Sequence, residues 1–447
     1  MRRQSVLYAA AIAMAAVLPF SLSLSYVPLS VALVVALSMR RLPKDFLLFV
    51  LLYVWRGITL LANGLPIKPL RDLYDKTGYV AFSPLRLTAR RFNALMLTLA
   101  LSSSAVALLG ILAAFTGLFR TGWIYTSCLG NCQLRVKRTT EIKAVVLTNR
   151  ERNRFVGGPR LTYDSPATLE PGEYTFHSYA GAIVKVRRKD VVLGEGWVGA
   201  YGERRFFRFN SFVGFYDHKM HSGAVFGILS VLFSSLGLFY SPLYLIFALL
   251  TLIATLLSGA KAYIFATLSA VLGVAYLRVG RLRELPKVLA GISLVGAAVL
   301  LHSPLREGFL WSAKARMSFW RIGVETFTKS PIFGIGYDNI SQILEPYHAK
   351  GIVDNAAHLH SSYLNALAET GVVGFILSIA IMLYFIILFL RWAFEEEGFR
   401  RAYLLGVFLS LLVVALVGLV ESNYDTAILN LLLTFLMGIG RALKWNI

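Results

Sequence analysis

A histidine just before a predicted membrane helix is the residue of this sequence best suited to proton transfer. His360 precedes Ser361 and Ser362, and either serine is a natural N-cap for the helix that follows. The positive end of a helix favours the neutral imidazole, which can act as a general base. His358 raises a metal site as an alternative, but no carboxylate is closer than Asp354, which makes a poor metal site. We therefore expect His360 to be a catalytic base or, alternatively, an ordinary surface histidine, and we expect no metal.

Three cationic residues lie where they could bind an anionic group. Lys261 stands between two apolar runs with no room for a loop, so it should lie at the outer end of a membrane helix. Arg316 and Arg321 flank the apolar stripe of an amphipathic helix near the membrane surface, and Glu325 is a partner for Arg321 at helical spacing. The alternatives are headgroup anchors for the arginines and a snorkelling lysine. The stripe consists of Met317, Trp320, Val324 and Phe327.

Turn signals separate the amphipathic helix from His360. The helix should end at Lys329-Ser330-Pro331, because the residue before a proline disfavours helical geometry. The following Gly334-Ile335-Gly336 predicts a tight turn with close backbone approach.

The elements that hold these residues must lie in lipid. The chain has 447 residues, of which 57% are hydrophobic and 15% charged, and its mean hydropathy is +0.64. One helical crossing takes roughly 20 apolar residues, and about ten such runs predict an all-α polytopic membrane protein with about 10–12 transmembrane helices. The net charge of +21 would suggest a nucleic-acid partner in a soluble protein. Here most cations flank apolar runs, so orientation and lipid headgroups explain them better and no nucleic acid is expected.

The apolar runs and the basic connections between them predict the topology. Short basic connections in the carboxy-terminal half should face the cytoplasm, which puts 121–217 and 303–370 together on the opposite face. The run 45–63 has basic residues on both flanks, so it is either a re-entrant segment turning at Arg56-Gly57 or an exception to the rule. The runs are 5–39 (a helical hairpin), 45–63, 92–119, 218–239, 241–257, 261–277, 286–302, 371–391, 402–420 and 424–442.

Residues 121–210 differ from the apolar runs. They alternate polar and apolar residues between Gly and Pro turn signals, which predicts a small extracytoplasmic β module. Its lysines and arginines outnumber its acids by 15 to 8, which suits either headgroup contact or a solvated face. Cys128 and Cys132 favour a local disulfide over free thiols, and two thiols without a nearby histidine make a metal site improbable.

These features divide the chain into five segments. They are amino-terminal transmembrane helices (1–120), a β-rich insertion (121–217), further transmembrane helices (218–302), an extracytoplasmic catalytic loop (303–370) and carboxy-terminal transmembrane helices (371–447).

Over roughly residues 205–395 the sequence resembles the O-antigen ligase family, which also includes O-antigen polymerases and protein O-oligosaccharyltransferases. The resemblance rests on a turn between membrane helices, an Arg-x-x-x-Trp helix with a glycine turn, and a histidine segment with a Glu-x-Gly block. They read Ser258-Gly259-Ala260-Lys261, then Arg316 to Trp320 with Pro331-Ile332-Phe333-Gly334-Ile335-Gly336, then His360-Ser361-Ser362-Tyr363-Leu364 with Glu369-Thr370-Gly371-Val372-Val373-Gly374. Lys261 stands where the family tends to have arginine, and Ser361 where asparagine is usual.

The resemblance implies a GT-C-like, multi-pass protein of the bacterial inner membrane with its active site on the periplasmic side. It implies inverting, metal-independent transfer of a glycan from an undecaprenyl diphosphate carrier to lipid A-core or to another glycan, without a cofactor. Lys261, Arg316 and Arg321 would bind the diphosphate, and His360 would be the base. The supporting residues would be His358, Tyr363 and Glu369. O-antigen polymerisation is the alternative within the family, and a transporter of lipid-linked glycans is the alternative outside it.

Overall fold

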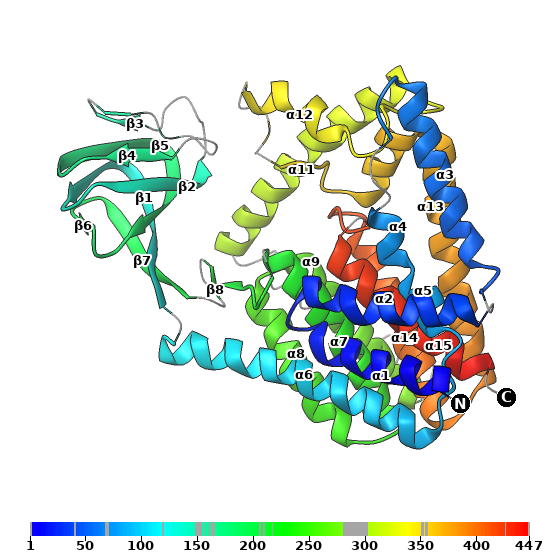
Figure 1. Cartoon of the computed structure of the whole chain (residues 1–447). Helices are drawn as coiled ribbons and strands as arrows, with labels where there is room; N and C mark the ends of the chain where they lie inside the picture. Colours follow the sequence, from blue (N-terminus) through cyan, green and yellow to red (C-terminus); the bar gives the residue numbers. More distant parts are fainter. Residues whose placement is uncertain are drawn as a thin grey trace. The chain divides into compact units, whose positions relative to one another are not determined.

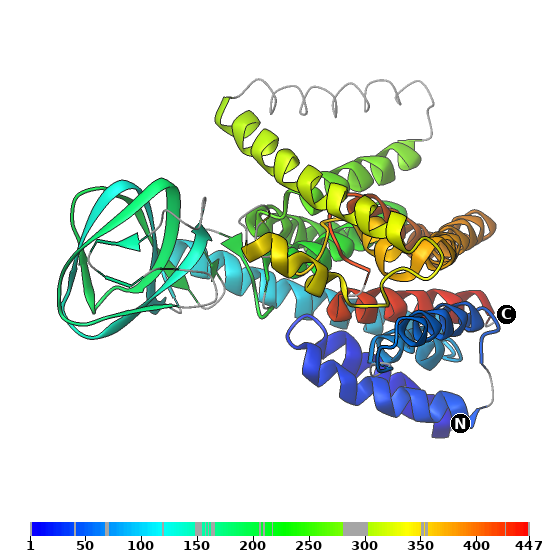
Figure 2. The ribbon, with the colours of Figure 1, turned by 90° about the horizontal axis from the view of Figure 1, so that it is seen from above.

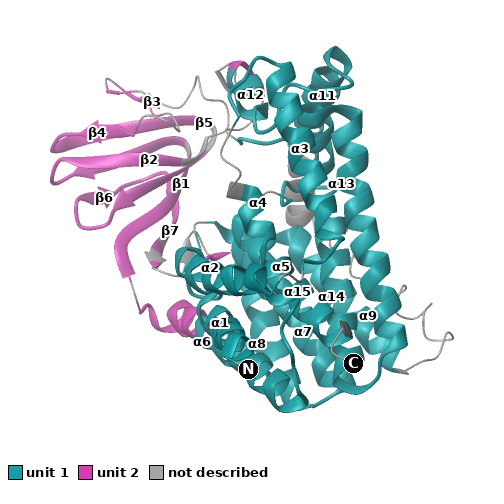
Figure 3. Cartoon of the chain, turned by 45° about the vertical axis from the view of Figure 1, so that its right-hand side comes forward, with its two compact units in different colours: residues 1–108, 215–345, 356–447 teal, residues 109–214, 346–355 magenta. Residues whose placement is uncertain are grey.

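The computed structural model separates the chain into a helical unit and a β unit (Figure 3). The helical unit comprises residues 1–108, 215–345 and 356–447, and the β unit comprises residues 109–214 and 346–355. The predicted run 286–302 and the basic residues Arg281, Arg283 and Lys287 lie outside the described residues. The structure describes residues 2–39, 42–67, 71–118, 120–147, 154–156, 158–159, 161, 166–204, 207–208, 211–216, 218–279, 303–349, 353, 356–424 and 426–445.

Helices form most of the described chain (Figure 1). In the described part, α6, α7, α13, α14 and α15 are long and apolar enough to cross a membrane, and α2, α3 and α8 are shorter apolar helices. These spans agree with the predicted polytopic membrane protein, and the described residues alone do not test the expected number of 10–12 helices. The helices are α1 (Arg2–Val17), α2 (Leu22–Ser38), α3 (Phe46–Ala62), α4 (Arg71–Lys76), α5 (Gly78–Phe82), α6 (Ala89–Thr116), α7 (Lys219–Phe239), α8 (Leu243–Ser258), α9 (Lys261–Val279), α11 (Ser303–Lys329), α12 (Ile340–Ala349), α13 (Ser362–Glu395), α14 (Gly398–Val417) and α15 (Ala427–Trp445).

Helix α7 is the central helix of the helical unit. Every residue from Ser222 to Gly237 is buried, as expected for a helix that is apolar on all sides. Small residues let its neighbours approach closely: a Cβ added to Gly223 would lie 2.6 Å from the Ala260 Cβ atom. Helices α8, α9 and α14 pack around it. The helix can therefore fix the positions of the residues at its amino-terminal end.

The amino-terminal helices bear on two expectations from the sequence. Helices α1 and α2 pack together as a hairpin at the edge of the unit, which confirms the predicted hairpin (Figure 2). The re-entrant alternative for 45–63 is wrong, because α3 runs unbroken through Arg56 and Gly57. The Arg56 guanidinium carbon lies 4.0 Å from the centre of the Tyr337 ring, so this buried cation is held by an aromatic face.

The β unit contains one β-sheet, in the segment where the sequence predicts a β module. Its strand order is β4-β2-β5-β1-β7-β8-β9, with β3 paired to β5 and β6 paired to β1. Alternate residues of β1 and β5, including Ile124, Val184 and Val186, point into one apolar core. The strands are β1 (Arg120–Val136), β2 (Thr140–Leu147), β3 (Arg154–Phe155), β4 (Ala167–Leu169), β5 (Gly172–Arg187), β6 (Val191–Leu193), β7 (Trp197–Arg204), β8 (Phe207–Arg208) and β9 (Ser211–Phe212).

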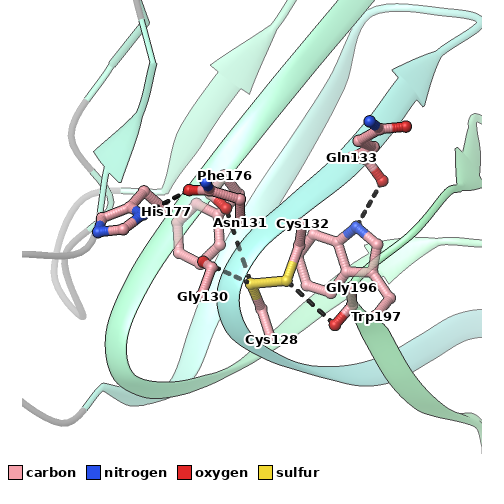
Figure 4. The surroundings of a disulfide bond; sticks show 9 residues. All are labelled: Cys128, Gly130, Asn131, Cys132, Gln133, Phe176, His177, Gly196 and Trp197. Atoms are coloured by element: carbon pink, nitrogen blue, oxygen red, sulfur yellow. Dashed lines mark hydrogen bonds between the residues drawn. A yellow bond between two sulfur atoms is a disulfide. The ribbon is translucent and has the colours of Figure 1, made fainter.

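A disulfide joins Cys128 to Cys132 within β1, as the sequence favoured (Figure 4). The pairing register of β1 with β5 shifts between Cys128 and Gly130, so the bond closes over a bulge. The Trp197 indole N–H donates to the Gln133 carbonyl at 2.6 Å beside it. The bond thus stabilises an irregular stretch of the longest strand.

Candidate active site

The amino terminus of α13 is held against the turn that follows α14. Ser361 is the N-cap, with its hydroxyl accepting from the Leu364 N–H at 3.3 Å, so the predicted helix start is confirmed. The Ser362 N–H donates to the carbonyls of Gly418 at 2.9 Å and Glu421 at 3.1 Å. His360, one residue before the cap, has a φ of +52°, an uncommon value for a residue other than glycine. These contacts fix His360 beside the α14–α15 turn.

Glu421, in that turn, joins two of the predicted site residues. Its Oε2 atom lies 3.4 Å from the His360 Nδ1 atom. Its Oε1 atom accepts a hydrogen bond from the Arg316 guanidinium, and the Arg316 Nε donates to the Val420 carbonyl at 3.0 Å. The side chains of Glu421, Arg316 and His360 are 13%, 23% and 26% exposed, so the group is half-buried and still accessible.

The Glu421 carboxylate also determines which histidine nitrogen can act as a base. An ionised carboxylate only accepts hydrogen bonds, so the His360 Nδ1 must be the protonated nitrogen when it faces Glu421. The Nε2 atom then carries the lone pair. The Phe319 ring packs against the imidazole with centroids 5.1 Å apart, which restricts its rotation. The arrangement resembles the base and orienting carboxylate found in many hydrolases.

The neighbouring groups keep Glu421 ionised. Burial alone would raise the pKa of this carboxyl, but the hydrogen bond from His360 and the charge of Arg316 lower it below its ordinary value. The sequence analysis missed Glu421. The available signal was an ionisable residue between the apolar runs 402–420 and 424–442, which is the same signal that identified Lys261.

Two lysines complete a cation cluster, which we define as Lys219, Lys261 and Arg316. Helix α8 ends at Ser258 and α9 begins at Lys261, so no loop separates them, as expected. Because Gly223 packs on this turn, Lys219 one helical turn earlier lies near it, within electrostatic range of Lys261, Arg316 and Glu421. Both lysines are exposed. The sequence analysis missed Lys219, although it stands at the start of the predicted apolar run 218–239.

Arg321 lies apart from this cluster. Its Nε donates to the Glu325 carboxylate at 2.9 Å, which confirms the predicted pair, and its side chain is 83% exposed. Helix α11 buries Phe319, Ile322 and Thr326. The predicted apolar stripe is only partly exposed: Met317 is 61% and Val324 48% exposed, whereas Trp320 and Phe327 are half-buried. Arg321 therefore lies where it can contact solvent or headgroups.

Glu369 helps to hold the glycine turn. The Gly336 N–H donates to the Glu369 carbonyl at 3.0 Å, and the Glu369 carboxylate accepts from the Ile340 N–H at the start of α12 at 3.1 Å. Gly371 breaks α13 with a φ of +65°. A Cβ on Gly334 would lie 2.4 Å from the Glu369 carbonyl carbon, so the predicted close approach is confirmed. These contacts assign Glu369 to the scaffold that supports the site.

Tyr363 and an apolar cavity lie near the α14–α15 turn. The Tyr363 hydroxyl donates to the Ala415 carbonyl at 2.8 Å, and its ring packs edge-on against Tyr424 at 5.4 Å. Asn423 and Tyr424 line one part of a cavity of about 90 Å³ among α3, α13, α14 and α15. The remaining walls are mainly apolar, with Arg56 and Lys76 among the lining residues.

His358 supports the backbone of His360. Its Nδ1 atom accepts from the His360 N–H at 3.3 Å, and the two rings meet edge-on at 4.7 Å. Burial, followed by the nearby His360, lowers the pKa of His358 from 6.5 to about 4, so its ring is neutral at physiological pH. In the part of the chain that the structure describes, no three His, Cys, Asp or Glu residues gather as a metal site would require.

The low pKa of His358 predicts an acid-sensitive fold. Because the folded pKa of about 4 is below the unfolded value of 6.5, this histidine stabilises the folded state fully above pH 6.5. That stability is lost as the pH falls from 6.5 to 4 and amounts to about 3 kcal/mol at most. The unfolding temperature of the wild type should therefore fall more between pH 7 and pH 4.5 than that of His358→Asn, which keeps an acceptor. Parallel curves for the two proteins would contradict this assignment.

Comparison with known proteins agrees with this geometry. The family model described as O-Antigen ligase matches residues 223–379, which confirms the resemblance inferred from the sequence. The matched segment contains Lys261, Arg316 and His360, whereas Lys219 and Glu421 lie outside it. No curated protein matches the chain. The match supports a membrane enzyme of the O-antigen ligase and polymerase type.

Proposed function

We propose that the protein transfers a glycan from an undecaprenyl diphosphate carrier to a hydroxyl acceptor, and that the acceptor is lipid A-core. The observation that carries the proposal is the contact of His360 and Arg316 with one carboxylate, Glu421, at the start of a membrane helix. This contact joins a base to a cation in an accessible, half-buried position. Transfer needs both, because a proton must leave the acceptor while negative charge grows on the diphosphate.

The proposed reaction is a single displacement at the anomeric carbon. The His360 Nε2 takes the proton of the acceptor hydroxyl, and the acceptor oxygen forms a bond to the anomeric carbon. The bond from that carbon to the diphosphate oxygen breaks, and its electron pair leaves with the carrier. Attack from the face opposite the leaving group inverts the anomeric configuration. Glu421 acts on the reaction through His360, which makes it a positioning residue.

The cation cluster is proposed to stabilise the departing diphosphate. Lys219, Lys261 and Arg316 carry three positive charges against one on Glu421, which leaves an excess of two. That excess suits a diphosphate, and no metal is required for charge balance. The narrow apolar cavity beside Asn423 and Tyr424 could accommodate a segment of one prenyl chain. Lysine at position 261 binds phosphate as a point charge, without the two-pronged contact of arginine.

We further propose that the active site faces the periplasm from the bacterial inner membrane. The basic connections Arg391-Arg400-Arg401 and Arg441-Lys444 favour cytoplasmic ends for the carboxy-terminal helices. The disulfide in β1 favours an oxidising compartment for the β unit. Together they predict that the β unit and the residues after α11 are accessible from outside the cell membrane.

Cysteine labelling checks this orientation. A membrane-impermeant maleimide applied to spheroplasts should modify Thr139→Cys in the β unit and Lys329→Cys at the end of α11. The matched control is Glu397→Cys, an exposed position between α13 and α14, which should react only after the membrane is permeabilised. Labelling of only one of the first two residues would contradict the shared face.

Reconstitution tests the function itself. Purified protein, lipid-diphosphate glycan and lipid A-core are incubated in detergent, and the products are separated by mass. Core-attached glycan is expected. Lengthened carrier-linked glycan would instead indicate a polymerase, and the absence of any covalent product with both acceptors would overturn the proposal in favour of a transporter.

A further inference from the structure

Asn423 lies in the turn between α14 and α15, and its side chain is buried, with 3% exposed. The amide uses its oxygen and both of its hydrogens in bonds to three helices. Its Oδ1 atom accepts from the Ser362 hydroxyl on α13 at 2.8 Å. Its Nδ2 atom donates to the Tyr263 hydroxyl on α9 at 3.2 Å and to the Val414 carbonyl on α14 at 3.2 Å. One side chain thus joins α9, α13 and α14 to the turn.

The partners of this amide fix its orientation. A backbone carbonyl only accepts hydrogen bonds, so the atom that faces Val414 must be Nδ2, and Oδ1 then faces Ser362. The Asn423 backbone N–H also donates to the Ser362 hydroxyl at 2.8 Å, so two bonds join these residues. Aspartate has the same shape but would place a carboxylate oxygen against the Val414 carbonyl oxygen. The surroundings therefore favour an amide over a carboxylate.

The contacts of Asn423 connect segments that carry members of the proposed site. In each segment the contacting residue follows a site residue by two positions. The pairs are Ser362 with His360, Tyr263 with Lys261, and Asn423 itself with Glu421. Asn423 lies outside the segment 223–379 that the family model matches. The amide therefore links the base, a cation and the orienting carboxylate through short stretches of chain.

Apolar packing alone does not define how these segments lie along one another. Helix α14 buries mainly leucine and valine side chains, and hydrophobic contact is non-directional. Hydrogen bonds in a buried, fully satisfied network have fixed directions and specify one arrangement. The arrangement matters for chemistry, because a displacement of about 1 Å can cost roughly 100-fold in rate.

We propose that Asn423 is a positioning residue that sets the register between the base, His360, and Lys261 at the start of α9. It acts through Ser362 and Tyr263. The inference rests on the proposed glycan transfer and adds a residue to that reaction. Without the amide the cation cluster still binds the diphosphate, but the base is misplaced relative to it. Loss of Asn423 should therefore lower kcat and leave KM for the donor nearly unchanged.

Steady-state kinetics of the full-length enzyme in nanodiscs, with lipid-diphosphate glycan as the donor, test this inference. The variant Asn423→Leu replaces the amide by an apolar side chain of similar size and should lower kcat by about 10- to 100-fold. The matched control is Asn93→Leu. Asn93 on α6 also bonds a tyrosine, accepting from the Tyr240 hydroxyl at 2.9 Å, and Tyr240 caps the end of α7 opposite Lys219. The control should keep the kcat of the wild type.

A second variant, Tyr263→Phe, keeps the test decisive if Asn423→Leu does not accumulate. It removes one bond of the network and should lower kcat several-fold. Combined with Asn423→Leu it should add little further loss, because that bond is already absent. With an active wild type, an unchanged kcat in Asn423→Leu or Tyr263→Phe would overturn the inference alone. A rise in KM without a fall in kcat would also overturn it and assign Asn423 to the wall of the apolar cavity. A wild type that forms no product would contradict the proposed function and this inference together.

Discussion

Replacing His360 with alanine should slow glycan transfer by about two to four orders of magnitude, the range for loss of a general base. The structure supports this size of effect because Glu421 faces Nδ1 and so leaves Nε2 as the proton acceptor. Glu421→Gln keeps the size of the side chain but loses the charge that stabilises the protonated imidazole. It should therefore lower kcat by less than the histidine variant does. Both rates are measured with purified protein and a lipid-diphosphate glycan.

His358→Ala is the control for this experiment. His358 supports the backbone of His360 and stays neutral, so its loss should reduce activity much less than the loss of His360. Metal chelators should leave the wild type unaffected, because cationic side chains are proposed in place of a metal. If the His360→Ala enzyme is active, His360 is not the general base. Equal losses for the two histidines combined with chelator sensitivity would replace it by a metal site.

Replacing Arg316 with alanine should abolish detectable transfer. A cation that both contacts Glu421 and faces the proposed diphosphate contributes charge-assisted hydrogen bonds that alanine cannot replace. Arg316→Lys should keep part of the activity, because it preserves the charge and loses the planar fork. Transfer is assayed at matched protein levels, since loss of the arginine also leaves a half-buried carboxylate without this partner.

Arg321→Ala provides the matched control on the same helix. Arg321 is exposed and pairs with Glu325, so its removal should change activity less than twofold, in line with the small contribution of exposed ion pairs. A double variant, Arg316→Met with Glu421→Gln, separates folding from chemistry because it removes both charges together. If that double variant is stable and as active as the wild type, Arg316 has no role in the reaction.

Local patterns in the sequence predicted the helical and β elements well. Periods of apolar residues identified α7, α14 and α15 to within a few residues, and for α13 the serine cap predicted a start at Ser361 or Ser362 that the apolar run 371–391 alone does not give. Alternation of polar and apolar residues identified the β unit, and close spacing favoured the disulfide. The sequence left open whether the run 45–63 is unbroken, because one of the two aromatic rings that contact Arg56, that of Tyr337, is far along the chain, while the other, that of Tyr53, lies on α3 itself.

The candidate site was only partly predictable for the same physical reason. Lys261, Arg316 and His360 have local signals, namely a helix end, an amphipathic helix and a cap. Arg316 and His360 both contact Glu421, which lies in the turn between α14 and α15. Backbone hydrogen bonds from Ser362 hold that turn beside them. Hydropathy periods give no register between separate helices. Arg321 shows that two residues on one helix need not share a site. It lies on the same helix as Arg316, but its side chain is exposed and pairs with Glu325.

The close backbone packing at Gly334 and Gly371 affects how mutational scans of this protein should be interpreted. A Cβ at Gly371 would lie 2.0 Å from the Ile332 carbonyl oxygen, and one at Gly334 would meet the backbone of Glu369. Both glycines also have positive φ, so every other amino acid is penalised twice. In a growth-based scan these positions should score as severely as His360, although neither glycine carries a side chain that could take part in chemistry. Abundance separates the two classes, because glycine variants should vanish from the membrane while histidine variants accumulate there as intact, inactive protein.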